Sequence, residues 1–174
     1  MFSLAVGVPV HLVPYLGERG YDVSVAAAAA GAIGATQLVG RLCFAPLERR
    51  VSPRVVSLGV FALQPLALLA LLLVPSTTGV VVFVVLFGAG RGAETLMRST
   101  VIAGRYGPLR FASIAGVLTL VITGAQAVSP VSLGAAYDRF GRYEPGLWAL
   151  VLVTAAAAAA IYIGNRREHR AAQV

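Results

Sequence analysis

The sequence has few charged residues, no lysine and a single cysteine, and each shortage excludes a class of protein. Charged residues make up 12% of the 174 residues, whereas soluble domains carry about 25%. All fourteen basic residues are arginines in scattered positions, so the net charge of +7 does not produce the lysine-rich face expected for nucleic-acid binding. The lone Cys43 excludes a disulfide framework.

Signatures of catalysis are also absent. The chain has no GxSxG elbow, no P-loop and no pair of aspartates within one apolar segment, and its apolar segments contain one histidine, His11. The glycines of 88–90 lie inside an apolar segment, which does not fit a dinucleotide-binding loop. We therefore expect no enzyme activity, no catalytic residue, no metal site and no cofactor.

Long apolar runs dominate the sequence, with 58% hydrophobic residues and a mean hydropathy of +0.83. Crossing a hydrocarbon core of about 30 Å takes roughly 20 helical residues. Six segments approach this length, separated by short loops, at residues 1–16, 23–46, 55–74, 79–97, 111–136 and 145–164. The sequence predicts an all-α membrane protein with one six-helix bundle over residues 1–164 and a basic tail over residues 165–174.

The arginines are distributed unevenly between alternate loops. One side has Arg49, Arg50, Arg54, Arg98, Arg105, Arg110, Arg166, Arg167 and Arg170, and the other has Arg19, Arg139 and Arg142. The positive-inside rule makes the richer side cytoplasmic, so a six-span chain has both termini in the cytoplasm.

The six segments differ in polarity. Segments 55–74 and 145–164 carry no charge, so we expect them mostly to face lipid, while the other four carry the polar residues and most of the glycines. This alternation is what two three-helix repeats around a cavity would give.

The fourth segment carries Arg91 and Glu94, followed by Arg98. Spacings of three and four residues place all three on one helical face, with Arg91 about 17 Å and Glu94 about 21 Å into the membrane. Ionised side chains are costly at this depth, which implies a partner or a role. Either Glu94 takes up a proton, or Arg91 binds an anionic substrate that Glu94 holds in place, or the three form a self-neutralised structural cluster.

Other polar residues are candidates for a cavity lining. The fifth segment has a polar stripe at Gly116, Thr119, Thr123, Gln126, Pro130 and Gly134, which is either a cavity wall or a helix-packing face. Gln37 follows the small-residue face of Ala27, Gly31 and Ala35. His11 lies between two prolines, where it either contacts a substrate or serves packing.

The end of the second segment carries a charged group. Arg41 either extends to the interface or joins Glu48, Arg49 and Arg50 in an ion-pair cluster that gates the cytoplasmic side.

Several motifs, taken in order, resemble the C-terminal half of major facilitator superfamily transporters, especially bacterial members of the monocarboxylate and oxalate/formate antiporter type. They are GAGRGAE at 88–94, Arg105-Tyr106-Gly107, Phe111, Ser113-Ile114, Gly116, Ser129-Pro130 and YDRFGRY at 137–143, preceded by HLVPYLGERGY at 11–21 and GRLCFAPLERR at 40–50. The resemblance covers essentially the whole chain.

The resemblance implies a secondary active transporter that moves a small solute, an organic anion or a drug, across the bacterial inner membrane by alternating access. It implies that His11, Gln37, Arg91, Glu94, Thr123 and Gln126 lie on or near the path, with proton coupling as one option. The expected partners are the bilayer, the substrate and either a separate N-terminal six-helix half or a second copy, because the chain looks truncated. The alternative is a six-helix membrane protein without transport activity, such as an assembly protein or a membrane enzyme of unrecognised chemistry.

Overall fold

The computed structural model describes the backbone of residues 4–171, and the side chains of residues 6–163 except 53, 54, 105, 106 and 108–111. All regular elements in this part are helices, in the order α1 (Leu4–Glu18), α2 (Val23–Arg50), α3 (Pro53–Leu73), α4 (Thr77–Phe140) and α5 (Glu144–Ala171). Residues 1–3 of the predicted first segment and residues 172–174 of the predicted tail lie outside the described residues.

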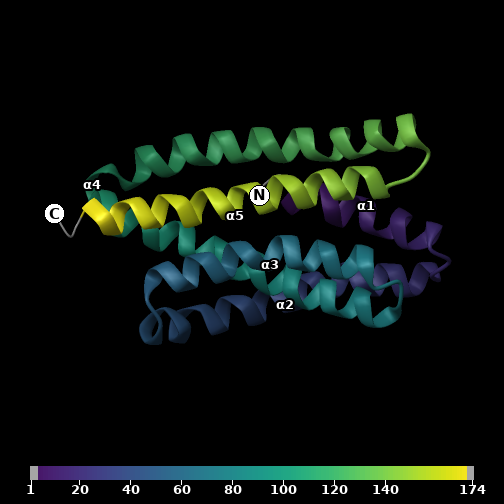
Figure 1. Ribbon diagram of the computed structural model, residues 1–174, viewed down its shortest axis with the longest axis horizontal. Coiled ribbons are helices and arrows are strands. Elements are labelled where there is room, and N and C mark those ends of the chain that lie inside the picture. The colour runs from purple at the N-terminus through teal and green to yellow at the C-terminus, as the bar shows by residue number, and fades with distance from the viewer. Residues whose placement is uncertain (1–3, 172–174) are drawn as a thin grey trace.

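α4 consists of two antiparallel parts joined at Gly107. The element is 64 residues long, but Gly107 has φ 68° and ψ 174°, and the chain turns back on itself there (Figure 1). Glycine adopts a positive φ at little cost because it has no Cβ. We call Thr77–Gly104 the first arm and Ala112–Phe140 the second arm. The sequence predicted a loop between residues 97 and 111, whereas the helix continues on both sides of one glycine.

In the part of the chain that the structure describes, five helical stretches are long and apolar enough to cross a membrane: Val23–Arg50, Val55–Leu73, the two arms of α4, and Glu144–Ile163. This confirms the prediction of an all-helical chain with several segments of membrane-spanning length. α1 has 15 residues, or about 22 Å at 1.5 Å per residue, and it starts near the middle of the bundle's length (Figure 1).

The turns lie at two ends of the bundle. The arginine-rich end contains the turn between α2 and α3 and the bend at Gly107, and the opposite end contains the other three turns (Figure 1).

Local chemistry explains several helix ends. Asp22 caps α2 by accepting a hydrogen bond of 2.8 Å from the Ser24 amide, Pro53 opens α3, and Gly141 ends α4 in the left-handed conformation.

Glycines set the closest helix contacts. Gly40 of α2 lies against the backbone of Ala89 in the first arm, and Gly92 of the first arm lies against the backbone of Gln37. Gly7 of α1 lies against the Ser129 side chain of the second arm. Backbones approach this closely only where side chains are absent. α2 therefore packs on the first arm, and α1 packs on the second.

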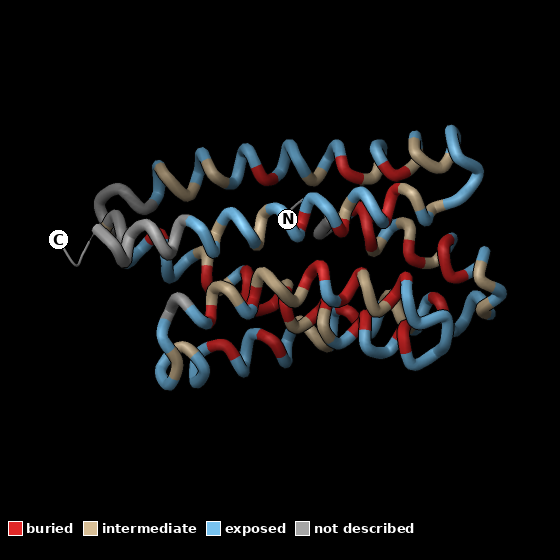
Figure 2. Tube along the Cα trace, in the orientation of Figure 1, coloured by how far each residue is buried: buried red, intermediate tan, exposed pale blue. Residues whose placement is uncertain are grey.

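The main core lies between α1, α3, the first arm and the start of α5. Its fully buried members include Leu12, Leu16, Leu68, Phe83 and Phe87. Figure 2 shows buried residues concentrated in this region, whereas the second arm is mostly exposed.

Segment 55–74, which we expected mostly to face lipid, is packed more closely in the bundle than the other uncharged segment, 145–164. In its most apolar stretch 39% of residues are buried, more than in any other span but the first arm. α3 packs on both the first arm and α5, and it buries Gln64 together with Ala67, Leu68 and Leu71. A segment without charge can lie in the interior as readily as against lipid, because both surroundings are apolar.

Candidate functional site

Glu94 is the most deeply buried charged side chain in the described part of the chain, with 6% of its surface exposed. Its Oε1 has no hydrogen-bond partner. Arg91 and Arg98, which precede and follow it on the same helical face, both interact electrostatically with it. A buried carboxylate oxygen without a donor is costly, so Glu94 is placed to accept a proton or a donor group from a ligand.

The neighbours of Glu94 follow from the register of the first arm. One turn before Arg91, Phe87 is fully buried in the core, and the guanidinium carbon of Arg91 lies 5.8 Å from the centroid of its ring. Arg91 is half-buried. Cation–π contact of this kind stabilises a guanidinium that is only partly hydrated. The charged cluster of Arg91, Glu94 and Arg98 thus follows directly after the apolar core along the first arm.

Gln64 is a buried polar residue that the sequence analysis missed. It is 2% exposed, and its Oε1 has no hydrogen-bond partner. A Cβ on Gly90 would lie 3.4 Å from its Nε2, so the amide packs directly against the first arm. Gly90 and Glu94 are four residues apart on one face. The α3 interface of the first arm therefore contains two unpartnered acceptor oxygens, and a lone glutamine within an apolar run was the only signal for the second.

Gln37 lies at the level of this cluster, on the side of the first arm that packs on α2. Its backbone carbonyl touches Gly92, two residues before Glu94, and the residue as a whole is half-buried. The structure therefore brings Gln37, Arg91 and Glu94 to one level of the bundle, while Gln64 approaches from α3.

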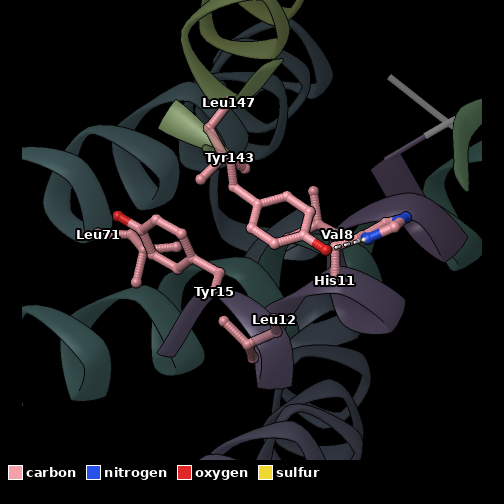
Figure 3. Close-up of a pocket in the computed structure, with 7 residues that line it drawn as sticks. All are labelled: Val8, His11, Leu12, Tyr15, Leu71, Tyr143 and Leu147. Atoms are coloured by element: carbon pink, nitrogen blue, oxygen red, sulfur yellow. Dashed lines mark hydrogen bonds between the residues drawn. The ribbon is translucent and has the colours of Figure 1, made fainter. Parts of the chain in front are cut away.

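His11 belongs to a different level. Its Nε2 lies 3.0 Å from the carbonyl oxygen of Pro130, and its Nδ1 lies 3.4 Å from the Tyr143 hydroxyl (Figure 3). A carbonyl can only accept, so Nε2 carries the hydrogen, and in the neutral ring Nδ1 accepts from the tyrosine. Partial burial raises the pKa of Tyr143, which keeps this hydroxyl protonated.

The space beside His11 is too small for a solute. The pocket lined by Val8, His11, Leu12, Tyr15, Leu71, Tyr143 and Leu147 has a volume of about 10 Å³, roughly that of one water probe (Figure 3). Tyr143 also stacks on Tyr137, with ring centroids 4.5 Å apart. His11 thus joins α1 to the second arm and to the turn before α5.

The polar stripe of the second arm divides into two parts. Gln126, Pro130 and Gly134 are half-buried, and Pro130 contacts α1 through His11. Gly116, Thr119 and Thr123 are exposed. Depth can be counted from the end of the bundle opposite the arginine-rich end. Thr123 and Glu94 are each 17 residues, about 25 Å, from the end of their arm there, whereas His11 is about 10 Å from the end of α1 there. Thr123 and Glu94 therefore share a level that His11 does not.

The predicted gating residues lie in the last three turns of α2. Arg41, Arg49 and Arg50 are exposed, and Glu48 is half-buried. An ion pair that the sequence analysis did not anticipate lies at the opposite end, where Arg19 Nη2 is 3.8 Å from Glu144 Oε1. Arg19 also donates to the carbonyl oxygens of Leu71 and Leu72 at 2.9 and 3.3 Å, so it covers the end of α3.

Among the described residues, no group of three or more histidine, cysteine, aspartate or glutamate side chains could hold a metal ion. The sequence matches no protein-family model and no curated protein. The site is therefore interpreted from its own geometry.

Proposed function

We propose that this chain is the C-terminal six-helix half of a secondary active transporter of the major facilitator type, moving a small organic anion or a drug across a bacterial inner membrane. The observation that carries the proposal is Glu94, buried with an unpartnered Oε1 between two arginines, in a helix long enough to span a membrane. Transport proteins retain ionisable residues at such depths because those residues bind ions and substrates.

The charges of the cluster favour coupled binding of an anion and a proton. With Glu94 ionised, Arg91, Glu94 and Arg98 sum to a single positive charge, which one carboxylate neutralises. Protonation of Glu94 removes a negative charge next to Arg91 and so strengthens anion binding. By reciprocity, a bound anion strengthens proton binding. An anion and a proton would therefore cross together.

The pairing of helices supports an arrangement of two inverted three-helix repeats. α1, the first helical segment, packs on the second arm, which is the fifth, and α2, the second segment, packs on the first arm, which is the fourth. An inverted repeat that relates segments one to four and two to five exchanges these two pairs. α3 and α5, the third and sixth segments, also pack on each other, and such a repeat maps this pair onto itself.

The exposed part of the polar stripe supports a partner across a cavity. Thr119 and Thr123 are exposed on an arm otherwise apolar enough to span a membrane, and Thr123 shares the level of Glu94. Exposed hydroxyls at that depth fit a water-filled path better than lipid. An N-terminal six-helix half or a second copy would close this path, with the arginine-rich end on the cytoplasmic side.

The test is uptake into proteoliposomes with an imposed proton gradient, using a panel of small carboxylates and hydrophobic drugs. The chain is assayed alone and fused behind a six-helix N-terminal half. We expect uptake by the fusion that falls to background with Glu94→Gln or Arg91→Gln. Glu18→Gln, an exposed carboxylate at the opposite end, is the matched control and retains uptake.

Folding of each variant is checked by circular dichroism and thermal unfolding in detergent. Loss of uptake in a folded Glu94→Gln variant excludes a purely structural cluster. If neither form takes up any solute, or if Glu18→Gln has the same effect as Glu94→Gln, the proposal is wrong and a membrane protein without transport activity becomes the better interpretation.

A further inference from the structure

A second cavity lies at the arginine-rich end, between α2, α3 and the first arm. Its volume is about 390 Å³, and its lining is apolar, with Phe44, Leu47, Val56, Val60 and Ala93 among the contributors. Ligands with polar groups need matching polar side chains, and this lining offers none. The cavity therefore fits a hydrocarbon chain.

The packing of α2 and α3 explains why the cavity exists. α2 and α3 are joined by a short turn, yet each packs mainly on the first arm, and the two helices hardly contact each other. Gly40 and Gly59 contribute no side chains to the space, and a Cβ on Gly59 would meet nothing within 4 Å. A larger residue at position 59 would fill the cavity.

The dimensions of the cavity match one acyl chain. Its lining runs along α2 from Gly40 to Val51, about 16 Å, which is close to half of a hydrocarbon core of about 30 Å.

The polar end of the cavity carries positive charge. Leu47 and Val51 line the cavity, and the residues between them are Glu48, Arg49 and Arg50. Both arginines are exposed, whereas Glu48 is half-buried, so the outward face is basic. α3 begins in the same turn, and Ser52 caps it without a side-chain hydrogen bond. The positive end of the α3 dipole therefore adds to the attraction for a phosphate.

We propose that this cavity binds one anionic phospholipid, with an acyl chain between α2 and α3 and the phosphate group at Arg49, Arg50 and the start of α3. The lipid occupies space that the protein leaves empty, and it neutralises a basic end. Anionic lipids are concentrated in the leaflet that basic loops face. The lipid site is separate from the proposed anion site, since its lining does not include Arg91 or Glu94.

Cys43 provides a direct probe, because it lines the cavity and is the chain's single cysteine. The full chain is placed in nanodiscs of phosphatidylcholine alone or mixed with phosphatidylglycerol, and alkylation by N-ethylmaleimide is followed by mass spectrometry. We expect slower alkylation with phosphatidylglycerol, because the acyl chain covers the thiol. Equal rates in the two lipids would contradict the proposal without requiring any variant.

Retention of phosphatidylglycerol is then measured by native mass spectrometry. The double variant Arg49→Gln/Arg50→Gln should weaken retention about tenfold, since basic residues near the surface each attract anionic lipid. Arg139→Gln/Arg142→Gln removes two exposed arginines from the opposite end and should change little. Equal losses in the two double variants would mean nonspecific surface attraction and would overturn the site.

Gly59→Leu tests the apolar part separately. It should reduce both lipid retention and Cys43 alkylation, because the leucine occupies the acyl-chain position. Gly31→Leu adds the same side chain at an α2 position where a Cβ meets nothing within 4 Å, and it should leave both unchanged. Undiminished lipid retention in a folded Gly59→Leu variant would also overturn the proposal.

Discussion

The two arms of α4 have the same mean hydropathy, 1.7, but very different surroundings. In the most apolar stretch of the first arm 56% of residues are buried, compared with 11% in the second arm. Gly88, Gly90 and Gly92 of the first arm each face a neighbouring helix, whereas Gly116 and Gly124 of the second arm have nothing near them. Mean hydropathy thus indicates that both arms could lie in a membrane, whereas the contacts of their glycines show that only the first arm is closely packed.

The same difference separates two kinds of polar residue. On the first arm, Glu94 is buried, so its carboxylate is shielded from lipid. On the second arm, Thr119 and Thr123 are exposed. If the proposed transporter is correct, the first arm holds the charge that binds, and the second arm forms the wall that a partner covers.

The largest expected effect comes from adding a side chain to the packed arm. Gly92→Leu places a Cβ into the backbone of Gln37 and separates α2 from the first arm. We expect it to lower the free energy of unfolding by about 3 kcal/mol, at the upper end of the usual cost of overpacking. Gly116→Leu makes the same change on the open arm and should alter stability by less than about 0.5 kcal/mol.

Thermal unfolding in detergent, followed by circular dichroism, measures both variants. Equal destabilisation would mean that the second arm is packed as tightly as the first, and the contrast between the arms would be lost.

The next largest effect is expected at Arg19, which contacts both α3 and α5 at the end of the bundle opposite the arginine-rich end. Arg19 donates to two carbonyl oxygens of α3, lies 4.9 Å from the Tyr15 ring centroid and pairs with Glu144. Its side chain is 21% exposed, so we expect Arg19→Gln to cost about 2 kcal/mol in the free energy of unfolding.

Glu144→Gln separates the ion pair from the helix-end contacts. The carboxylate is 48% exposed and 3.8 Å from Arg19, so its loss should cost less than about 1 kcal/mol. Chemical unfolding monitored by Trp148 fluorescence compares the two variants. If Glu144→Gln costs as much as Arg19→Gln, the ion pair is the important contact, and the carbonyl contacts are not.

The sequence predicted those parts of the fold that depend on local chemistry. The starts of α2 at Val23 and of α5 near residue 145 follow from apolar length, and α3 begins at Pro53, two residues before the predicted start at 55. The reversal between residues 97 and 111 was predicted, but not its position at Gly107 within a continuous helical element, because glycine is compatible with helix, loop or reversal. The close packing of α3 on the first arm and α5 was not predicted for a related reason, since an apolar surface does not reveal what covers it.

The candidate site was predicted in part. Helical spacing alone placed Arg91, Glu94 and Arg98 on one face. It could not show that Gln64 approaches from α3, because that contact depends on how two helices cross. The bond between His11 and Tyr143 joins residues 132 positions apart, and no local pattern encodes it. Exposure of Thr123 and burial of Ser129 likewise depend on the orientation of one helix against α1.

Ser129 is one of the few buried residues of the second arm, and its removal should be favourable. It is 5% exposed, touches Gly7, and its Oγ has no hydrogen-bond partner. Ser129→Ala removes an unsatisfied buried hydroxyl and should raise the free energy of unfolding by about 1 kcal/mol. Ser132→Ala, where an exposed hydroxyl bonds the Val128 carbonyl oxygen, should change it by less than about 0.5 kcal/mol. Parallel thermal melts distinguish them, and a destabilised Ser129→Ala variant would indicate that the hydroxyl binds a group such as water.

The smallest effect is expected at the capped start of α2. Hydrogen bonds from Ser24 hold the pKa of Asp22 below its usual range, so the folded state prefers the carboxylate. A lowered folded-state pKa contributes stability above the usual value of about 4, and this contribution is lost as the pH falls through the folded-state value. The unfolding temperature should therefore drop slightly more between pH 6 and pH 3 in the wild type than in Asp22→Asn, which keeps a capping oxygen without titrating. Ser76 precedes α4 without a side-chain hydrogen bond, so Ser76→Ala should leave both the unfolding temperature and its pH dependence unchanged. An identical pH response in the wild type and Asp22→Asn would mean that water satisfies the first amides of α2 equally well, and that this helix, like the first arm, is held by its packing and not by its cap.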